Sequence, residues 1–167
     1  RLHGLVREFL RTRLEVFDIN HIFKRSLYNA LATVPNISKW ANRRDIQRFA
    51  KYQPHLEEGA RHLSRDAAEA DLLRPFINLQ YYHQSRGFYK TARKWAEAAF
   101  AAATQQLGSA HPLMARIHTN KGLTAFLVRD LEQAQLEYEQ ALSICHQHHG
   151  ETNQLVADLY ILQAVTL

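Results

Sequence analysis

The sequence is poor in the features that staple small secreted proteins or anchor proteins in membranes. Its single cysteine, Cys145, has no second cysteine with which to form an internal disulfide, which excludes a disulfide-stapled scaffold and favours a reducing compartment. No apolar run approaches the roughly 20 residues that a membrane-spanning helix needs. We therefore expect a cytoplasmic protein without a membrane anchor, whose 167 residues bury a core without covalent staples.

Several segments that would define other classes of protein are also missing. The chain has no initiator methionine and no secretory signal, and it opens at Arg1 with a charged amphipathic stretch. We expect it to be a piece of a longer protein. It contains no Gly-rich phosphate loop, no HExxH and no paired-carboxylate motif. We therefore expect no catalytic residues, no metal and no cofactor in this piece.

What the sequence has in abundance is helical periodicity. Glycine and proline are few, with six and four residues, and no stretch shows the alternation of a strand. The pattern predicts an all-α fold, with helices over about 2–17 and 21–33, a third after Asn42, and a fourth with Pro54 in its first turn.

From about residue 64 the chain repeats itself with a period of 42 residues. From Arg74 onward ten positions are identical after this shift, where chance over the overlap gives about three or four, so a repeat array is the natural interpretation. The identical pairs are Arg74/Arg116, Asn78/Asn120, Ala92/Ala134, Glu97/Glu139, Ala99/Ala141, Gln105/Gln147, Gly108/Gly150, Leu113/Leu155, Ala115/Ala157 and Thr124/Thr166.

The repeated positions are those that close helix packing needs. Small residues let two antiparallel helices approach, and large apolar residues fill the remaining gaps. We expect stacked helical hairpins that form a right-handed superhelix, with the first helix of each hairpin lining a concave surface. The predicted small residues are Ala92, Ala99, Gly122, Ala134, Ala141 and Ala164, and the predicted bulky ones are Phe76, Tyr89, Phe100, Leu131 and Tyr138.

This spacing resembles the tetratricopeptide repeat in its 42-residue form, as found in kinesin light chains. The resemblance rests on the connector Leu107-Gly-Ser-Ala-His-Pro-Leu-Met-Ala115 and on the block Gly87-Phe-Tyr with Ala92 and Ala99. It covers about 100 residues. The sequence departs from the family at Arg129, where the family usually has Gly, and at Lys121, where it usually has Leu. The resemblance implies a domain that binds proteins or peptides.

The first 65 residues resemble a different segment. Arg1-Leu-His-Gly-Leu-Val-Arg-Glu-Phe-Leu10 is similar to the end of the winged-helix region in NB-ARC signalling ATPases of the STAND class. Pro54-His-Leu-Glu-Glu58 is similar to a helical segment that follows in bacterial members whose sensor half is a repeat array. In that family the histidine matching His3 contacts the phosphate of bound ADP, although the usual aspartate is Gly4 here. The ATP or ADP pocket itself would lie upstream of Arg1.

These resemblances imply a division of the chain and a role in signal transduction. Residues 1–65 would be a helical adaptor, followed by repeats over about 66–108 and 109–150 and a partial repeat over 151–167. The array would be the sensing and autoinhibitory part of a bacterial STAND-type ATPase, with the intramolecular ATPase core as one partner. The alternatives are a passive assembly scaffold and a basic adaptor that binds nucleic acid.

One face of the repeats is a candidate ligand groove. Arg74 and Asn78 are four residues apart and share a helix face, and Arg116 and Asn120 reproduce the pair one repeat later. An arginine beside an amide suits a carboxylate, so we expect an acidic protein or peptide as ligand, with Tyr82, or alternatively Tyr81, as an aromatic floor. The other interpretation is a polar ladder that only solvates this face. The third repeat has Asp158 and Leu162 at these positions, so the ladder ends there.

The charges are divided unequally between the two parts of the chain. Residues 1–65 carry 13 basic and 6 acidic residues, whereas residues 66–167 carry 8 and 10. A basic patch attracts nucleic acid, but no groove-reading motif accompanies the charge, so nucleic acid is the less favoured partner. The candidate contact residues are Arg7, Arg11, Arg43, Arg44, Arg48 and Lys51.

Two further motifs favour structural roles. Cys145 and His149 are four residues apart, a workable spacing for two metal ligands, but two ligands do not make a site. We expect Cys145 to be a buried thiol beside exposed histidines at a helix end. His111 precedes Pro112 in the connector between repeats, where starting the next helix explains it better than catalysis does.

Overall fold

The computed structural model describes residues 33–61, 73–148 and 154–166. All of the regular elements in these ranges are helices, which confirms the all-α fold. The helix predicted over 2–17 and most of that over 21–33 lie outside the described residues, as do His3, Arg7, Arg11, His149 and Gly150. No helix in the described ranges is long and apolar enough to cross a membrane.

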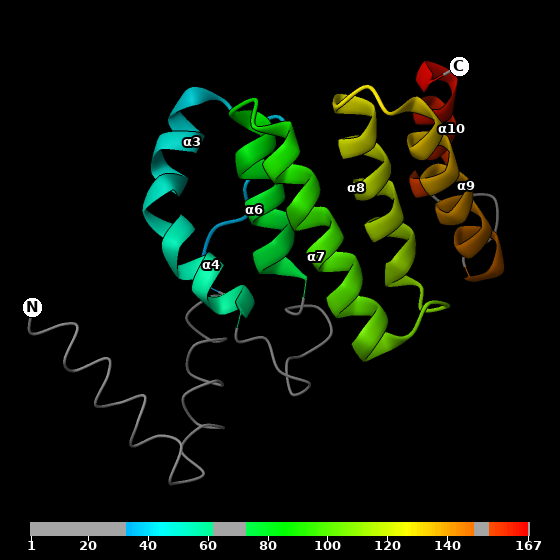
Figure 1. The fold of residues 1–167 in the computed structure, drawn as a ribbon, viewed down its shortest axis with the longest axis horizontal. Helices are drawn as coiled ribbons and strands as arrows, with labels where there is room; N and C mark the ends of the chain where they lie inside the picture. Colours follow the sequence, from blue (N-terminus) through cyan, green and yellow to red (C-terminus); the bar gives the residue numbers. More distant parts are fainter. Residues whose placement is uncertain (1–32, 62–72, 149–153, 167) are drawn as a thin grey trace, which may run out of the picture.

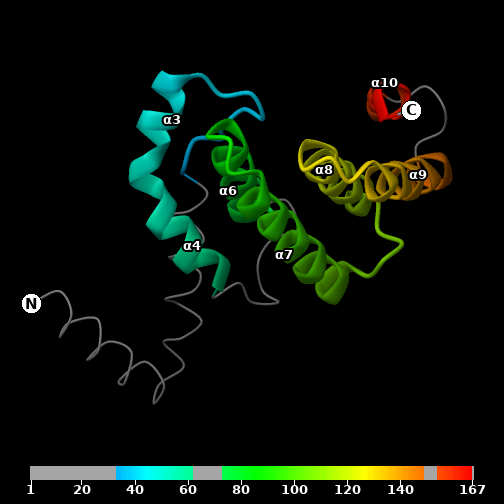
Figure 2. The same cartoon turned by 45° about the horizontal axis from the view of Figure 1, so that its top comes forward.

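Two helical hairpins and one further helix make up the repeat region. The first hairpin is α6 (Arg74–Ser85) with α7 (Tyr89–Leu107), and the second is α8 (Leu113–Leu127) with α9 (Leu131–His148). Helix α10 (Gln154–Thr166) packs against α9 and touches α8. Figures 1 and 2 show these helices stacked in chain order. The arrangement places consecutive hairpins side by side, as the 42-residue period predicts.

The alanine positions lie inside the array. Ala92, Ala99, Ala134 and Ala141 are all buried, and the last three share one core with larger side chains such as Met114. Gly122 of α8 lies directly against Tyr138 of α9, because a methyl group placed on Gly122 would overlap the Tyr138 ring. The prediction of small residues at the helix contacts is confirmed at these positions.

Three of the residues that were predicted to pack at helix contacts are exposed instead. Tyr89 is 38% exposed and Leu131 is 40% exposed, so these bulky residues at the start of the second helices do not fill gaps in the core. Ala164 is exposed on α10 as well. Its counterpart Gly122 is covered by a side chain of α9, and no described helix covers Ala164 in that way.

The connections follow the backbone geometry that the sequence predicts. Gly108 ends α7 with a φ of +84°, where glycine has no steric cost. His111 Nδ1 accepts a hydrogen bond from the Leu113 backbone N–H over 3.2 Å, which confirms its role at the start of α8. Arg129 has a φ of +68°, and its counterpart Gly87 has a φ of +78°. The departure at Arg129 therefore puts a side chain where the backbone favours glycine.

The described part of the N-terminal segment packs on the first hairpin. It forms α3 (Arg43–Phe49), a short 3-10 turn η1 (Ala50–Tyr52) and α4 (Gln53–Arg61). Asn42 caps α3, since its Oδ1 accepts from the Asp45 backbone N–H over 3.0 Å. A second core joins this segment to α6, and both α3 and α4 contact that helix. Its buried members are Val34, Ile37, Phe49, Leu56, Leu79 and Tyr82.

Candidate functional site

The first helices of the two hairpins meet through a polar contact. The Tyr81 hydroxyl of α6 donates a hydrogen bond to Asn120 Oδ1 of α8 over 3.0 Å. Gln80 Nε2 donates to the Asn120 carbonyl oxygen over 3.2 Å. Burial raises the pKa of Tyr81, while the positive charge of Arg116 and the bond to Asn120 act in the opposite direction. The Arg116 guanidinium therefore lies close enough to the phenol to act on it electrostatically.

The structure separates the predicted groove residues into two groups. Arg116 is exposed, Arg74 is half-buried and Asn120 is 8% exposed. Tyr81, the alternative aromatic floor, contacts this group. Asp158 of α10 is exposed at the equivalent position. We name Tyr81, Arg116 and Asn120 the inner-face cluster.

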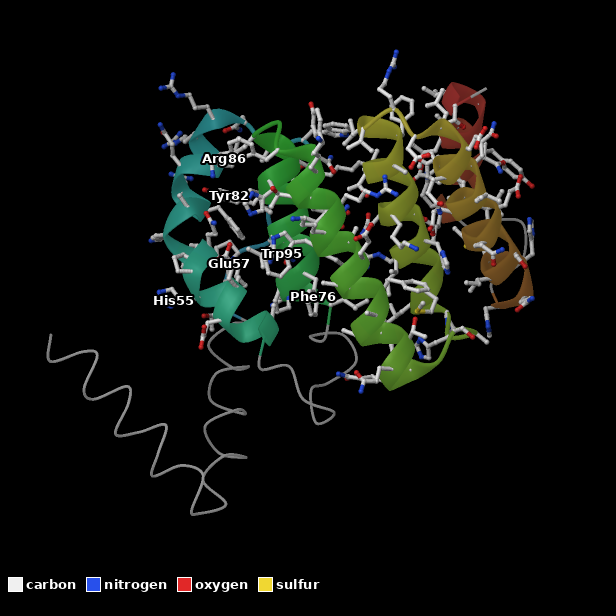
Figure 3. The ribbon with its side chains drawn as sticks, in the orientation of Figure 1. His55, Glu57, Phe76, Tyr82, Arg86 and Trp95 are labelled. Atoms are coloured by element: carbon white, nitrogen blue, oxygen red, sulfur yellow. The ribbon has the colours of Figure 1, made fainter. Side chains whose placement is uncertain are left out.

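Asn78 and Tyr82 lie under the N-terminal segment. Asn78 is 2% exposed, and its Oδ1 accepts from the Ile37 backbone N–H over 3.2 Å. Tyr82 is 3% exposed and packs with its ring centroid 5.4 Å from that of Phe49. Figure 3 shows Tyr82 between α6 and the α3–α4 segment. These two side chains contact the N-terminal segment instead of lining a groove. Sequence periodicity does not predict this contact, because it reports only which residues share a helix face.

A buried ionic cluster lies on the opposite side of α8, and the sequence analysis missed it. Glu137 of α9 is 4% exposed. Its Oε2 lies 2.7 Å from His118 Nδ1, and its Oε1 accepts from Lys121 Nζ over 2.6 Å and from Gln133 Nε2 over 2.8 Å. Burial alone raises the pKa of Glu137, but the hydrogen bonds and positive charges of His118 and Lys121 outweigh it, so the pKa lies below its usual range. Lys121 Nζ also sits 4.1 Å from the Phe100 ring centroid.

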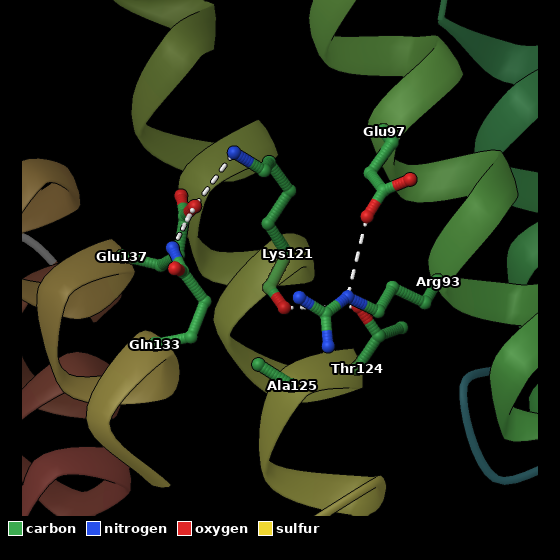
Figure 4. Close-up of a pocket in the computed structure, with 7 residues that line it drawn as sticks. All are labelled: Arg93, Glu97, Lys121, Thr124, Ala125, Gln133 and Glu137. Atoms are coloured by element: carbon green, nitrogen blue, oxygen red, sulfur yellow. Dashed lines mark hydrogen bonds and ion pairs between the residues drawn. The ribbon is translucent and has the colours of Figure 1, made fainter. Parts of the chain in front are cut away.

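The cluster borders a hollow of about 180 Å³ between α7, α8 and α9 (Figure 4). Arg93 Nε and Nη1 donate to Glu97 and Asp130 over 3.2 Å and 3.0 Å at its rim. The charged groups of the lining are thus paired with one another. The remaining lining residues are Lys121, Thr124, Ala125, Gln133 and Glu137.

A signal for this cluster was present in the sequence. Lys121 stands where the resembling family has leucine, and His118 and Glu137 stand 42 residues after Phe76 and Trp95. Phe76 and Trp95 pack in the first hairpin with their ring centroids 6.3 Å apart. A comparison of the two repeats would have shown that three apolar residues of the first are replaced by ionisable residues in the second, namely His118, Lys121 and Glu137.

The suspected metal ligands occupy different environments. Cys145 is fully buried, as predicted, and burial raises the pKa of its thiol. His146 and His148 are exposed at the end of α9. Within the described ranges, no group of three or more His, Cys, Asp or Glu side chains is arranged to hold a metal ion.

Comparison with known proteins gives one family. The model of the tetratricopeptide repeat matches residues 75–164, which is more than half of the chain. Repeats of this type generally mediate protein–protein interactions and are typically non-catalytic. A search of curated proteins finds no match.

Proposed function

Because the chain belongs to the tetratricopeptide repeat family, we propose that it binds a protein or peptide segment along the inner face formed by its first helices. The inner-face cluster is the observation that carries this proposal. Tyr81 and Asn120 join α6 to α8, and Arg116, which is exposed, acts electrostatically on the Tyr81 phenol. A rigid polar contact next to a free charged group is suited to hold a ligand in one orientation.

An acidic ligand fits this cluster best. Arginine presents several N–H donors in a planar fork that matches a carboxylate. The Asn120 amide nitrogen and the Tyr81 ring offer a neighbouring donor and a flat surface. Arg74 occupies the same position one repeat earlier, so an extended segment with two acidic residues would reach both arginines. Asp158 at the third position disfavours a third acidic residue there.

The test is a selection from a library of short random peptides displayed on phage, carried out with the full chain. We expect the recovered peptides to be enriched in Asp and Glu, and we expect Arg116→Ala to weaken their binding at least tenfold. Lys94→Ala is the matched control, since Lys94 is an exposed cation on α7, and it should leave affinity unchanged. Peptides without acidic residues that bind Arg116→Ala as well as the parent would refute the acidic preference.

We further propose that the array serves as the sensing and autoinhibitory part of a cytoplasmic STAND-type ATPase. The resemblance of residues 1–10 and 54–58 supports this role. In such a switch, the ligand has to favour the open arrangement over the closed one to shift the population. The sequence upstream of Arg1 in the parent gene tests it. A Gly-rich phosphate loop with an acidic metal-binding motif supports the switch, and their absence leaves a passive scaffold.

A further inference from the structure

We propose that single-stranded nucleic acid binds one edge of the array, away from the inner-face cluster. This edge joins the segment that leads into α3 to the turn between α6 and α7. We call it the N-terminal edge surface, and it consists of Lys39, Trp40, Arg43, Arg44, Arg86 and Phe88. The proposal is independent of peptide binding and would stand if the inner face bound nothing.

Two hydrogen bonds fix the parts of this surface against each other. Gln84 Nε2 donates to the Lys39 carbonyl oxygen over 2.8 Å, and Ser85 Oγ accepts from the Ala41 backbone N–H over 3.1 Å. Figures 1 and 2 both show the start of α3 beside the turn between α6 and α7. Residues that are about 45 positions apart in sequence therefore form one surface.

The surface carries aromatic rings that face solvent. Trp40 is 61% exposed and Phe88 is 50% exposed. The Arg86 guanidinium lies 4.8 Å from the centroid of the Phe88 ring, within the range of a cation–π contact, and its Nη1 also donates to the Tyr82 hydroxyl over 3.2 Å. Exposed rings of this kind provide platforms on which unpaired bases stack.

The charged residues in the two segments that carry these rings are almost entirely basic. Lys39, Arg43, Arg44 and Arg86 are all exposed. Asp45 is the one acidic residue within 38–48 and 84–92. Basic side chains that track a phosphate backbone and aromatic rings that stack on bases are the two components of a non-specific single-strand site.

The fold does not require this chemistry, because the next repeat lacks it. Val128, Asp130 and Glu132 stand 42 residues after Arg86, Phe88 and Lys90. The same turn therefore carries two basic residues and an aromatic ring in the first hairpin, whereas in the second it carries one basic residue, Arg129, two acidic residues and no aromatic ring. Of the two turns within hairpins that the structure describes, the one between α6 and α7 combines basic residues with an exposed aromatic ring.

The composition of the surface favours a base-containing polymer over a membrane. An interfacial membrane site inserts aliphatic as well as aromatic side chains. The large aliphatic side chains that are exposed in the described ranges lie elsewhere, at Leu131, Leu136, Ile161 and Val165 on α9 and α10. At the N-terminal edge surface the large exposed apolar groups are aromatic.

The experiment measures binding of the full chain to fluorescein-labelled oligo(dT) and oligo(U) of about 20 nucleotides by fluorescence anisotropy. We expect the affinity to fall steeply between about 50 and 200 mM salt. The double variant Trp40→Ala/Phe88→Ala should weaken binding at least tenfold, since it removes two stacking platforms. The triple variant Arg43→Ala/Arg44→Ala/Arg86→Ala should weaken binding and flatten its salt dependence.

Tyr160→Ala is the matched control, because Tyr160 is an aromatic residue that is 54% exposed on α10. It should bind the oligonucleotides like the parent. Circular dichroism confirms that each variant keeps its helices. The proposal is overturned if the aromatic variant binds unchanged, or if the chain sediments with phosphatidylserine vesicles and does not bind the oligonucleotides.

Discussion

His118 Nδ1 lies 2.7 Å from Glu137 Oε2 at the positions that two packed aromatic rings occupy one repeat earlier. The two helices of a hairpin are thus joined by the packed rings of Phe76 and Trp95 in one copy. In the next copy they are joined by the contact of Glu137 with His118 and its ion pair with Lys121. Lys121 is the third such replacement, because it occupies the position that Leu79 has in the first hairpin. The hollow beside the ion pair is consistent with this exchange, since Trp95 is larger than Glu137.

The first prediction concerns the energetic cost of that cluster. Glu137→Leu leaves Lys121 without its buried partner, and we expect it to lower the free energy of unfolding by about 3 kcal/mol. The triple variant His118→Phe/Lys121→Leu/Glu137→Trp restores the side chains of the first hairpin. It should be as stable as the parent or more stable, because no buried charge remains. Urea denaturation measures both, and a triple variant less stable than Glu137→Leu would contradict this explanation.

The second prediction concerns acid. The pKa of Glu137 in the folded chain lies below its usual range, so the folded state favours the carboxylate more than the unfolded state does. This contribution is fully present above the unfolded pKa of about 4.3 and is lost as pH falls through the folded pKa. We expect the unfolding free energy to decrease more steeply below about pH 5 in the parent than in Glu137→Gln. Parallel slopes in urea titrations at several pH values would show that Glu137 has no such role.

The third prediction uses the positive φ at Arg129. This backbone conformation strains an L side chain but not glycine. We expect Arg129→Gly to raise the free energy of unfolding by about 0.5 kcal/mol, after the extra freedom of glycine in the unfolded chain is deducted. Arg129→Ala keeps the strain and serves as the control. Gly87→Ala should destabilise the first hairpin, and equal stabilities of these variants in thermal melts would rule out the strain.

The fourth prediction concerns the contact between Gly122 and Tyr138. A methyl group at Gly122 would overlap the Tyr138 ring, so Gly122→Ala should destabilise the chain by about 2 kcal/mol. Adding Tyr138→Leu should recover part of this loss by making room. In the first hairpin the equivalent positions hold Gln80 and Ala96, both buried. The larger residue of the pair is therefore on the first helix in that hairpin and on the second helix, as Tyr138, in the next one. A double variant that is less stable than the sum of the two single changes would argue against steric overlap.

The sequence by itself determined the helices and their repetition. Helical periodicity and the 42-residue period follow from local chemistry, because an alanine or glycine at a fixed spacing has the same effect wherever the hairpin recurs. For this reason the buried alanines, the glycine at Gly108 and the helix start at His111 were predictable. The departures at Lys121 and Arg129 were visible as well, although their consequences were not.

Only the tertiary structure decided which polar side chains of the first helices stay available. Asn78 and Asn120 occupy equivalent positions in consecutive repeats. Asn78 accepts a hydrogen bond from the Ile37 backbone in the segment before α3, whereas Asn120 accepts one from the Tyr81 hydroxyl. The exchange of Phe76 and Trp95 for His118 and Glu137 likewise has meaning only once the two helices are seen in contact. Burial and partner choice depend on neighbours distant in the chain, and local spacing carries no information about them.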